Sequence, residues 1–103
     1  MAYLDTLLAA LSHPTRRESL RLLRTGNELC LCELMVSIGA GQSTMSRHMT
    51  TLREAGLVTD RRDAQWVRYQ FSSNADAGIA AIVAAVLDVA EDRAAASDDR
   101  SAA

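Results

Sequence analysis

Apolar residues recur every three or four positions along most of the chain, which is the spacing of amphipathic helices. The pattern predicts five helices, over residues 3–11, 14–25, 30–38, 42–55 and about 74–90. Pro14 suits the first turn of the second helix, and Gly26 and Gly56 suit the residues that end the second and the fourth. Ser73-Asn74 is the expected cap of the fifth helix, and Gly39-Ala40-Gly41 predicts a tight turn between the third and the fourth.

After the fourth helix the pattern changes from helical spacing to alternation. Val67, Tyr69 and Phe71 alternate with Arg68 and Gln70, as in a strand with one buried face. We expect two short strands, over residues 57–62 and 65–72, joined at Asp63-Ala64 in a hairpin.

The order of these elements predicts a mainly α fold with a small β-hairpin, in which the third and fourth helices and the hairpin form a winged helix-turn-helix. Within the fourth helix, Met45, Met49 and Leu52 are spaced i, i+4 and i+7 and predict its buried stripe. In such a unit the second helix lies in the major groove of DNA, and its N-terminal residues face the base edges. We therefore expect residues 1–95 to form one DNA-binding and dimerisation domain, followed by a disordered tail over residues 96–103.

Polar residues on the fourth helix and the hairpin are the expected DNA contacts. Base or phosphate contacts from the helix are expected of Gln42, Ser43, Thr44, Ser46 and Arg47. His48 lies at the edge of the buried stripe, where a packing or phosphate-contacting role is expected. The hairpin should meet the DNA backbone or minor groove through Arg61, Arg62 and Arg68. The alternative is an ordinary solvated face whose arginines pair with nearby acids.

The charge distribution supports a nucleic-acid partner although the net charge of the 103 residues is −2. Residues 39–71 contain five arginines against three acids, whereas residues 72–103 contain two arginines against six acids. A basic middle and an acidic end indicate that one face meets phosphate and the other does not.

The fifth helix carries more apolar surface than a small monomer needs to bury. Its apolar seam comprises Ile79, Ile82, Val83, Val86, Leu87 and Ala90. We expect a homodimer through the first and fifth helices, with monomer core as the alternative. No apolar run approaches the roughly 20 residues that span a bilayer, and the N-terminus lacks the pattern of a signal peptide. We therefore expect no membrane contact, a cytoplasmic location, reduced thiols and no structural disulfide.

Cys30 and Cys32 are the only cysteines, and they stand at the start of the third helix, for which Asn27 is a candidate cap. Thiolates bind soft, thiophilic ions. Residues i and i+2 of an α-helix are about 200° apart around the axis. One ion could therefore bridge both sulfurs only if this turn unwinds, which would disturb the support of the fourth helix. Inert buried cysteines, a redox switch and a small thiol enzyme are the alternatives. The sequence argues against a thiol enzyme, because it has no βαβ pattern around the two cysteines.

Four segments resemble the ArsR/SmtB repressors. Three of them are Ser12-His13-Pro14-Thr15-Arg16, residues 42–49 (QSTMSRHM) and residues 52–58 (LREAGLV). The fourth, residues 28–34 (ELCLCEL), resembles more narrowly the ELCVCDL box of the arsenic-responsive branch. The resemblance implies a dimeric repressor, not an enzyme, that binds a pseudo-palindromic operator. It also implies release from the operator when arsenic(III) or antimony(III) binds Cys30 and Cys32, with no catalytic cofactor.

Met35 stands where arsenic sensors of this type often have a third cysteine. We expect it to pack in the core, which leaves two thiolates. A monomethylated trivalent arsenical has two exchangeable positions and would be satisfied by two thiolates, so a methylated arsenical remains an alternative effector beside redox state and another thiophilic ion. Zinc is not expected, because the family's zinc site needs histidine and the fifth helix has none.

Overall fold

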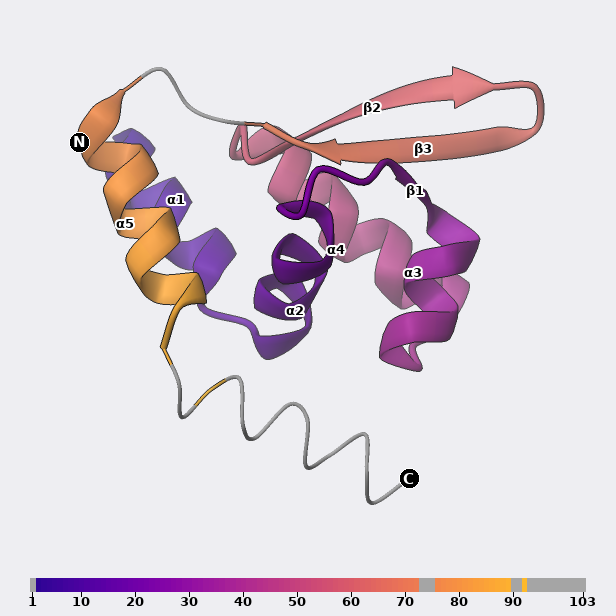
Figure 1. The fold of residues 1–103 in the computed structure, drawn as a ribbon, viewed down its shortest axis with the longest axis horizontal. Helices are drawn as coiled ribbons and strands as arrows, with labels where there is room; N and C mark the ends of the chain where they lie inside the picture. Colours follow the sequence, from indigo (N-terminus) through magenta and orange to yellow (C-terminus); the bar gives the residue numbers. More distant parts are fainter. Residues whose placement is uncertain (1, 73–75, 90–91, 93–103) are drawn as a thin grey trace.

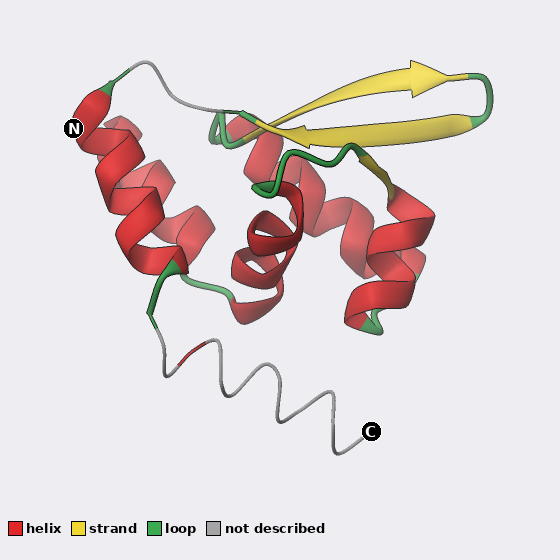
Figure 2. Ribbon diagram, viewed as in Figure 1, coloured by secondary structure: helices red, strands yellow, loops and turns green. Residues whose placement is uncertain are grey.

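The computed structural model describes residues 2–72, 76–89 and 92, and contains five helices and a three-stranded sheet in that part of the chain (Figures 1 and 2). The elements are α1 (Ala2–Leu11), α2 (Pro14–Leu23), β1 (Leu29–Cys30), α3 (Leu31–Ile38), α4 (Gln42–Glu54), β2 (Val58–Asp63), β3 (Trp66–Phe71) and α5 (Ala77–Leu87). α1 and α5 lie together at one end of the molecule, and the β2–β3 hairpin projects beyond the other helices (Figure 1). The predicted helices and hairpin are confirmed, and every helix except α1 is shorter than the pattern suggested.

The sheet contains one strand that the pattern did not predict. Its order is β1-β3-β2, and both pairings are antiparallel. β1 has only two residues, which pair as Leu29 with Tyr69 and Cys30 with Arg68. Two residues are too few to display an alternating pattern, so this strand is visible only through its partner. The hairpin turns at Ala64, which adopts a left-handed φ of 55°.

The core collects the predicted apolar faces of four helices. Met45, Met49 and Leu52 are fully buried, as the stripe on α4 predicted. They meet fully buried leucines of the preceding helices, which are Leu7, Leu20, Leu23 and Leu34. Each such side chain contributes about 1.5–3 kcal/mol when it leaves water. This burial fixes α4 with its opposite face outward.

Helix ends follow the sequence in part. α2 begins at Pro14, and His13 precedes it as the N-cap, where its Nδ1 accepts the N–H of Thr15 at 3.2 Å. The expected cap of α5 at Ser73-Asn74 is wrong: the N-cap is Asp76, whose carboxylate accepts two backbone N–H groups of the first turn. Residues 73–75 and the predicted tail over residues 96–103 lie outside the described residues.

α5 is attached to the domain by two buried residues and a group of ion pairs. Val83 and Leu87 pack into the core. Arg17 pairs with Asp92 through bonds of 2.9 and 3.0 Å, and Arg21 reaches the same carboxylate at 2.5 Å. These guanidinium groups, Arg17 first, hold the pKa of Asp92 far below its usual range.

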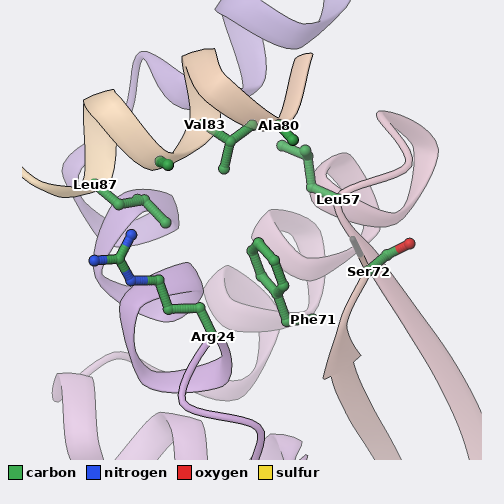
Figure 3. A pocket seen from close by; sticks show the side chains of 8 residues that line it. Arg24, Leu57, Phe71, Ser72, Ala80, Val83 and Leu87 are labelled. Carbon is green, nitrogen blue, oxygen red and sulfur yellow. The ribbon is translucent and has the colours of Figure 1, made fainter. Parts of the chain in front are cut away.

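A cavity of about 200 Å³ lies between α5 and the base of the hairpin (Figure 3). Phe71 and Leu57 face Val83 across it, and Arg24 extends along its edge toward α5, where it pairs with Asp88. None of the helices in the described part of the chain has the length and apolar content needed to cross a membrane.

Candidate functional site

The two cysteines lie where β1 gives way to α3, and they are joined in a disulfide. Cys30 has extended backbone angles, φ −79° and ψ 163°, and is the N-cap residue rather than part of the helix. Cys32 lies in the first turn. The expectation that the sulfurs face apart is therefore wrong, because the 200° rotation applies only when both residues are helical. The expectation of no disulfide, which rested on a reducing compartment, is also wrong, because the extended backbone at Cys30 brings the two sulfurs together.

Cys30 also starts α3 through a reciprocal pair of hydrogen bonds. The backbone N–H of Glu33 donates to Sγ of Cys30 at 3.4 Å, and the N–H of Cys30 donates to Oε1 of Glu33 at 2.8 Å. This is a capping box with sulfur in place of the usual hydroxyl. Asn27, the expected cap, does not have this role. The sulfur that could bind a ligand is thus the acceptor that supports the helix.

The surroundings of the thiol pair are apolar on one side and poor in further ligands. Cys30 is 5% exposed, whereas Cys32 is exposed and lines a shallow hollow with Leu29 and Val36. Val36 is 85% exposed, which is unusual for a large apolar residue. Met35 packs against the core, as expected. Within residues 2–72, 76–89 and 92, no three histidine, cysteine or acidic side chains gather where they could hold one metal ion.

α4 turns its predicted polar face to solvent. Gln42, Ser43, Thr44 and Arg47 are exposed, and Ser46 is half-buried. The N-cap is Gly41, and among the described residues no side chain caps the helix. The first-turn N–H groups of α4 are therefore left for an external acceptor, for which a phosphate is well suited.

His48 occupies a junction between three helices. Its Nδ1 is 3.0 Å from Nη1 of Arg16, and its ring centroid is 4.3 Å from that of His13. The same guanidinium donates to the carbonyl oxygens of Ala9 and Ala10 at the end of α1. Burial, followed by the positively charged groups around it, lowers the pKa of His48. Its packing role was anticipated; the link from α4 to α1 was not.

The three hairpin arginines have different environments. Arg61 forms two hydrogen bonds with the carboxylate of Glu28, at 2.7 and 2.8 Å, and Arg68 pairs with Asp63 at 3.0 Å. Arg62 has no ion-pair partner among the described residues and lines a hollow of about 270 Å³ between α4 and the hairpin. The alternative of arginines paired with acids therefore holds for two of the three. The pairing of Glu28 with Arg61 could not be predicted from the spacing of residues along the sequence, because 33 residues separate the two.

One face of α1 and α5 exposes large apolar side chains. Leu4 and Leu8 of α1 are 44% and 47% exposed, and Val89 beyond α5 is 48% exposed. Leu8 and Val89 share a shallow depression with Leu11 and Val86. Exposed apolar side chains grouped in this way are typical of surfaces at which proteins associate.

Comparison with known proteins identifies relatives of most of the chain. Residues 13–60 match the model of the family described as bacterial regulatory protein, arsR family. The arsenical resistance operon repressor of Escherichia coli is 38% identical over 77 residues, which are 75% of this chain and 66% of that protein. The chain spans 55% to 66% of the length of the curated relatives it matches first.

Solved structures share the fold. HlyU from Vibrio cholerae is 33% identical and superposes with a TM-score of 0.69 over 82% of this chain and 88% of that one. The homodimeric winged helix-turn-helix DNA-binding domain of Mb0332 from Mycobacterium bovis is 26% identical, with a TM-score of 0.70 over 89% of this chain and 82% of that one. These matches confirm the winged helix-turn-helix fold and a regulator rather than an enzyme.

Proposed function

The chain belongs to the arsR family of bacterial regulatory proteins, and from this premise we propose that it is a homodimeric transcriptional repressor released from its operator by trivalent arsenic or antimony. The observation that carries the proposal is the thiol pair: Cys30 and Cys32 bring two sulfurs together at the cap of the helix that packs on α4. Relatives that are named arsenical resistance operon repressors support the same effector class.

The DNA-binding surface in this proposal consists of the outer face of α4 and the hairpin. Gln42, Ser43, Thr44, Ser46 and Arg47 contact base edges or phosphates, and Arg61, Arg62 and Arg68 contact the backbone. The free N–H groups at the start of α4 add a phosphate contact. The apolar faces of α1 and α5 join two copies, so that two α4 helices meet successive major grooves of a pseudo-palindromic operator.

Arsenite binds the reduced form of the pair. Each thiol proton leaves with one hydroxide of As(OH)₃ as water, and two S–As bonds form while one hydroxide remains on arsenic. The S–As bond uses electron density of Cys30 Sγ that otherwise accepts the N–H of Glu33. The cap of α3 weakens, and the form with a disturbed α3 gains stability relative to the form that binds DNA. Arsenite thus binds the form with a disturbed α3 more tightly than the form that binds DNA, and this difference in affinity shifts the population toward the released form.

A methylated trivalent arsenical is a second occupant of this site. It forms the same two S–As bonds and carries its methyl group in place of the remaining hydroxide. The apolar hollow of Leu29 and Val36 beside Cys32 offers contact for that group. The donor set of two sulfurs saturates this species, whereas arsenite keeps one exchangeable position.

The disulfide itself favours a redox-responsive repressor as the other candidate function. Two thiols lose two electrons and two protons to a hydroperoxide, whose oxygens leave as water and an alcohol or as two waters.

Fluorescence anisotropy tests these functions on a labelled duplex that the protein itself selects from a random-sequence pool. With a phosphine reductant, arsenite should weaken binding of wild type by about tenfold or more and leave Cys30→Ser/Cys32→Ser bound. Ser37→Ala, a change on the same helix that leaves both thiols in place, is the matched control and should respond as wild type. Release of the double variant by arsenite would refute the effector site. Release by hydrogen peroxide alone would establish the redox function instead, and failure to enrich any duplex would refute DNA binding.

A further inference from the structure

Glu28 and Arg61 form an ion pair whose geometry matches the way arginine holds phosphate. Nε of Arg61 lies 2.8 Å from Oε2 of Glu28, and Nη2 lies 2.7 Å from Oε1. Two parallel N–H···O bonds from one edge of a guanidinium are the arrangement that arginine also offers to a phosphate. The edge of Arg61 that would grip the DNA backbone is therefore already occupied by a carboxylate.

The sheet holds Glu28 in this position. Glu28 immediately precedes β1, and across the three strands Cys30 lies opposite Arg68, which lies opposite Arg61. Because residues two apart in a strand point to the same face, Glu28 extends on the face that carries Arg61. The pairing of β1 thus places the adjoining backbone of Glu28 where its side chain reaches the guanidinium of Arg61.

The ion pair is accessible to a competing anion. The side chain of Arg61 is 56% exposed and that of Glu28 is 29% exposed. The hydrogen bonds from Arg61 lower the pKa of Glu28, so the carboxylate stays ionised at neutral pH. An exposed ion pair is held weakly, and a phosphate of a DNA duplex can replace the carboxylate without opening the core.

We propose that Glu28 is an internal competitor of DNA phosphate, which occupies Arg61 in the free protein and must be displaced when the hairpin binds DNA. The inference rests on the proposed DNA-binding role of the hairpin. When DNA binds, Arg61 exchanges the carboxylate of Glu28 for a phosphate. Arg61 therefore adds little net affinity for DNA. Arg62, which has no ion pair in the described part of the chain, has no such cost.

Neutralising Glu28 should free this arginine. In Glu28→Gln the amide is a poorer partner for the guanidinium, and we expect the selected duplex to bind about threefold to tenfold more tightly at low salt, since a dimer carries two such pairs. Arg61 contacts the same phosphate in both proteins once the carboxylate is displaced, so the slope of log K against log salt concentration should stay the same while the affinity rises. A variant that gained a further phosphate contact would instead steepen this slope by about 0.9.

A double-mutant cycle separates this effect from a general change in charge. The gain from Glu28→Gln should vanish in the Arg61→Gln background and persist in the Arg62→Gln background, which removes an equal charge from the neighbouring residue. Binding is measured by anisotropy at four salt concentrations. Circular dichroism of each variant verifies the fold.

Each outcome decides the proposal. If Arg61→Gln weakens binding but Glu28→Gln leaves the affinity unchanged, the competitor role is wrong while DNA binding by the hairpin stands. An equal gain in the Arg61→Gln background would reduce Glu28 to a diffuse charge and overturn the proposal. If neither Arg61→Gln nor Arg62→Gln alters binding, the hairpin is not part of the DNA interface, and both the proposed contact surface and this inference fail.

Discussion

The capping role of Cys30 can be separated from its role as a ligand by two substitutions. Cys30→Ser keeps an acceptor at the N-cap and removes the thiol, whereas Cys30→Ala removes both. The comparison is made with reductant present, so that the wild-type protein also has free thiols. Because serine is a strongly preferred N-cap residue, we expect the serine variant to be the more stable of the two.

The structure sets the size of the difference. Sγ of Cys30 accepts the N–H of Glu33, and the side chain is 5% exposed. Alanine leaves that N–H without its acceptor, which costs about 1 kcal/mol, and removes a buried atom of about the size of a methylene, worth about 0.8 kcal/mol. Serine gives up only the second contribution. We therefore expect Cys30→Ala to be about 1 kcal/mol less stable than Cys30→Ser.

Urea unfolding at one fixed protein concentration measures this difference, because dimerisation makes stability depend on concentration. With a slope of about 2 kcal/mol per molar urea, the midpoints should differ by about 0.5 M. Both variants should equally lose the release by arsenite, since each keeps one thiol. Equal midpoints for serine and alanine would show that the sulfur does not support α3, and the mechanism of release through a weakened cap would then be refuted.

Three further perturbations test the remaining contacts. Burial and nearby cations lower the pKa of His48, so stability should fall as pH drops below the ordinary value of 6.5, and a stability–pH curve that keeps this slope in His48→Gln would contradict the reasoning. Arg17 holds the pKa of Asp92 low, so the ion pair should stabilise fully above the ordinary value of 3.8 and progressively less as the pH falls toward the lowered pKa. Asp92→Asn should cost about 1 kcal/mol at neutral pH and clearly less at pH 2, as measured by urea unfolding. Leu8→Glu should yield monomers in sedimentation velocity, and an unchanged dimer would exclude this face from the interface.

Local patterns in the sequence were sufficient for the helices and for the outward polar face of α4. The spacing of Met45, Met49 and Leu52 is a property of one helix, because side chains three and four residues apart share a face. Burying that stripe forces Arg47 and the other polar residues outward. The winged helix-turn-helix followed from the order of such segments, without knowledge of any contact between them.

Contacts between distant segments could not be read from the sequence. Arg17 meets Asp92 across 75 residues and Arg16 meets His48 across 32, and both pairs depend on how the helices pack. Arginine and acidic residues occur along the whole chain, so composition offers many equivalent pairings and periodicity selects none of them.

The thiol site shows both limits. The sequence by itself determined that two sulfurs stand at the start of α3, and that no third cysteine accompanies them. Only the tertiary structure decided how they face each other, because pairing of β1 with β3 holds Cys30 in extended backbone and makes it the cap of α3. The same pairing places Glu28 against Arg61. Strand pairing depends on residues far along the chain, and a two-residue strand carries no pattern of its own that could reveal it.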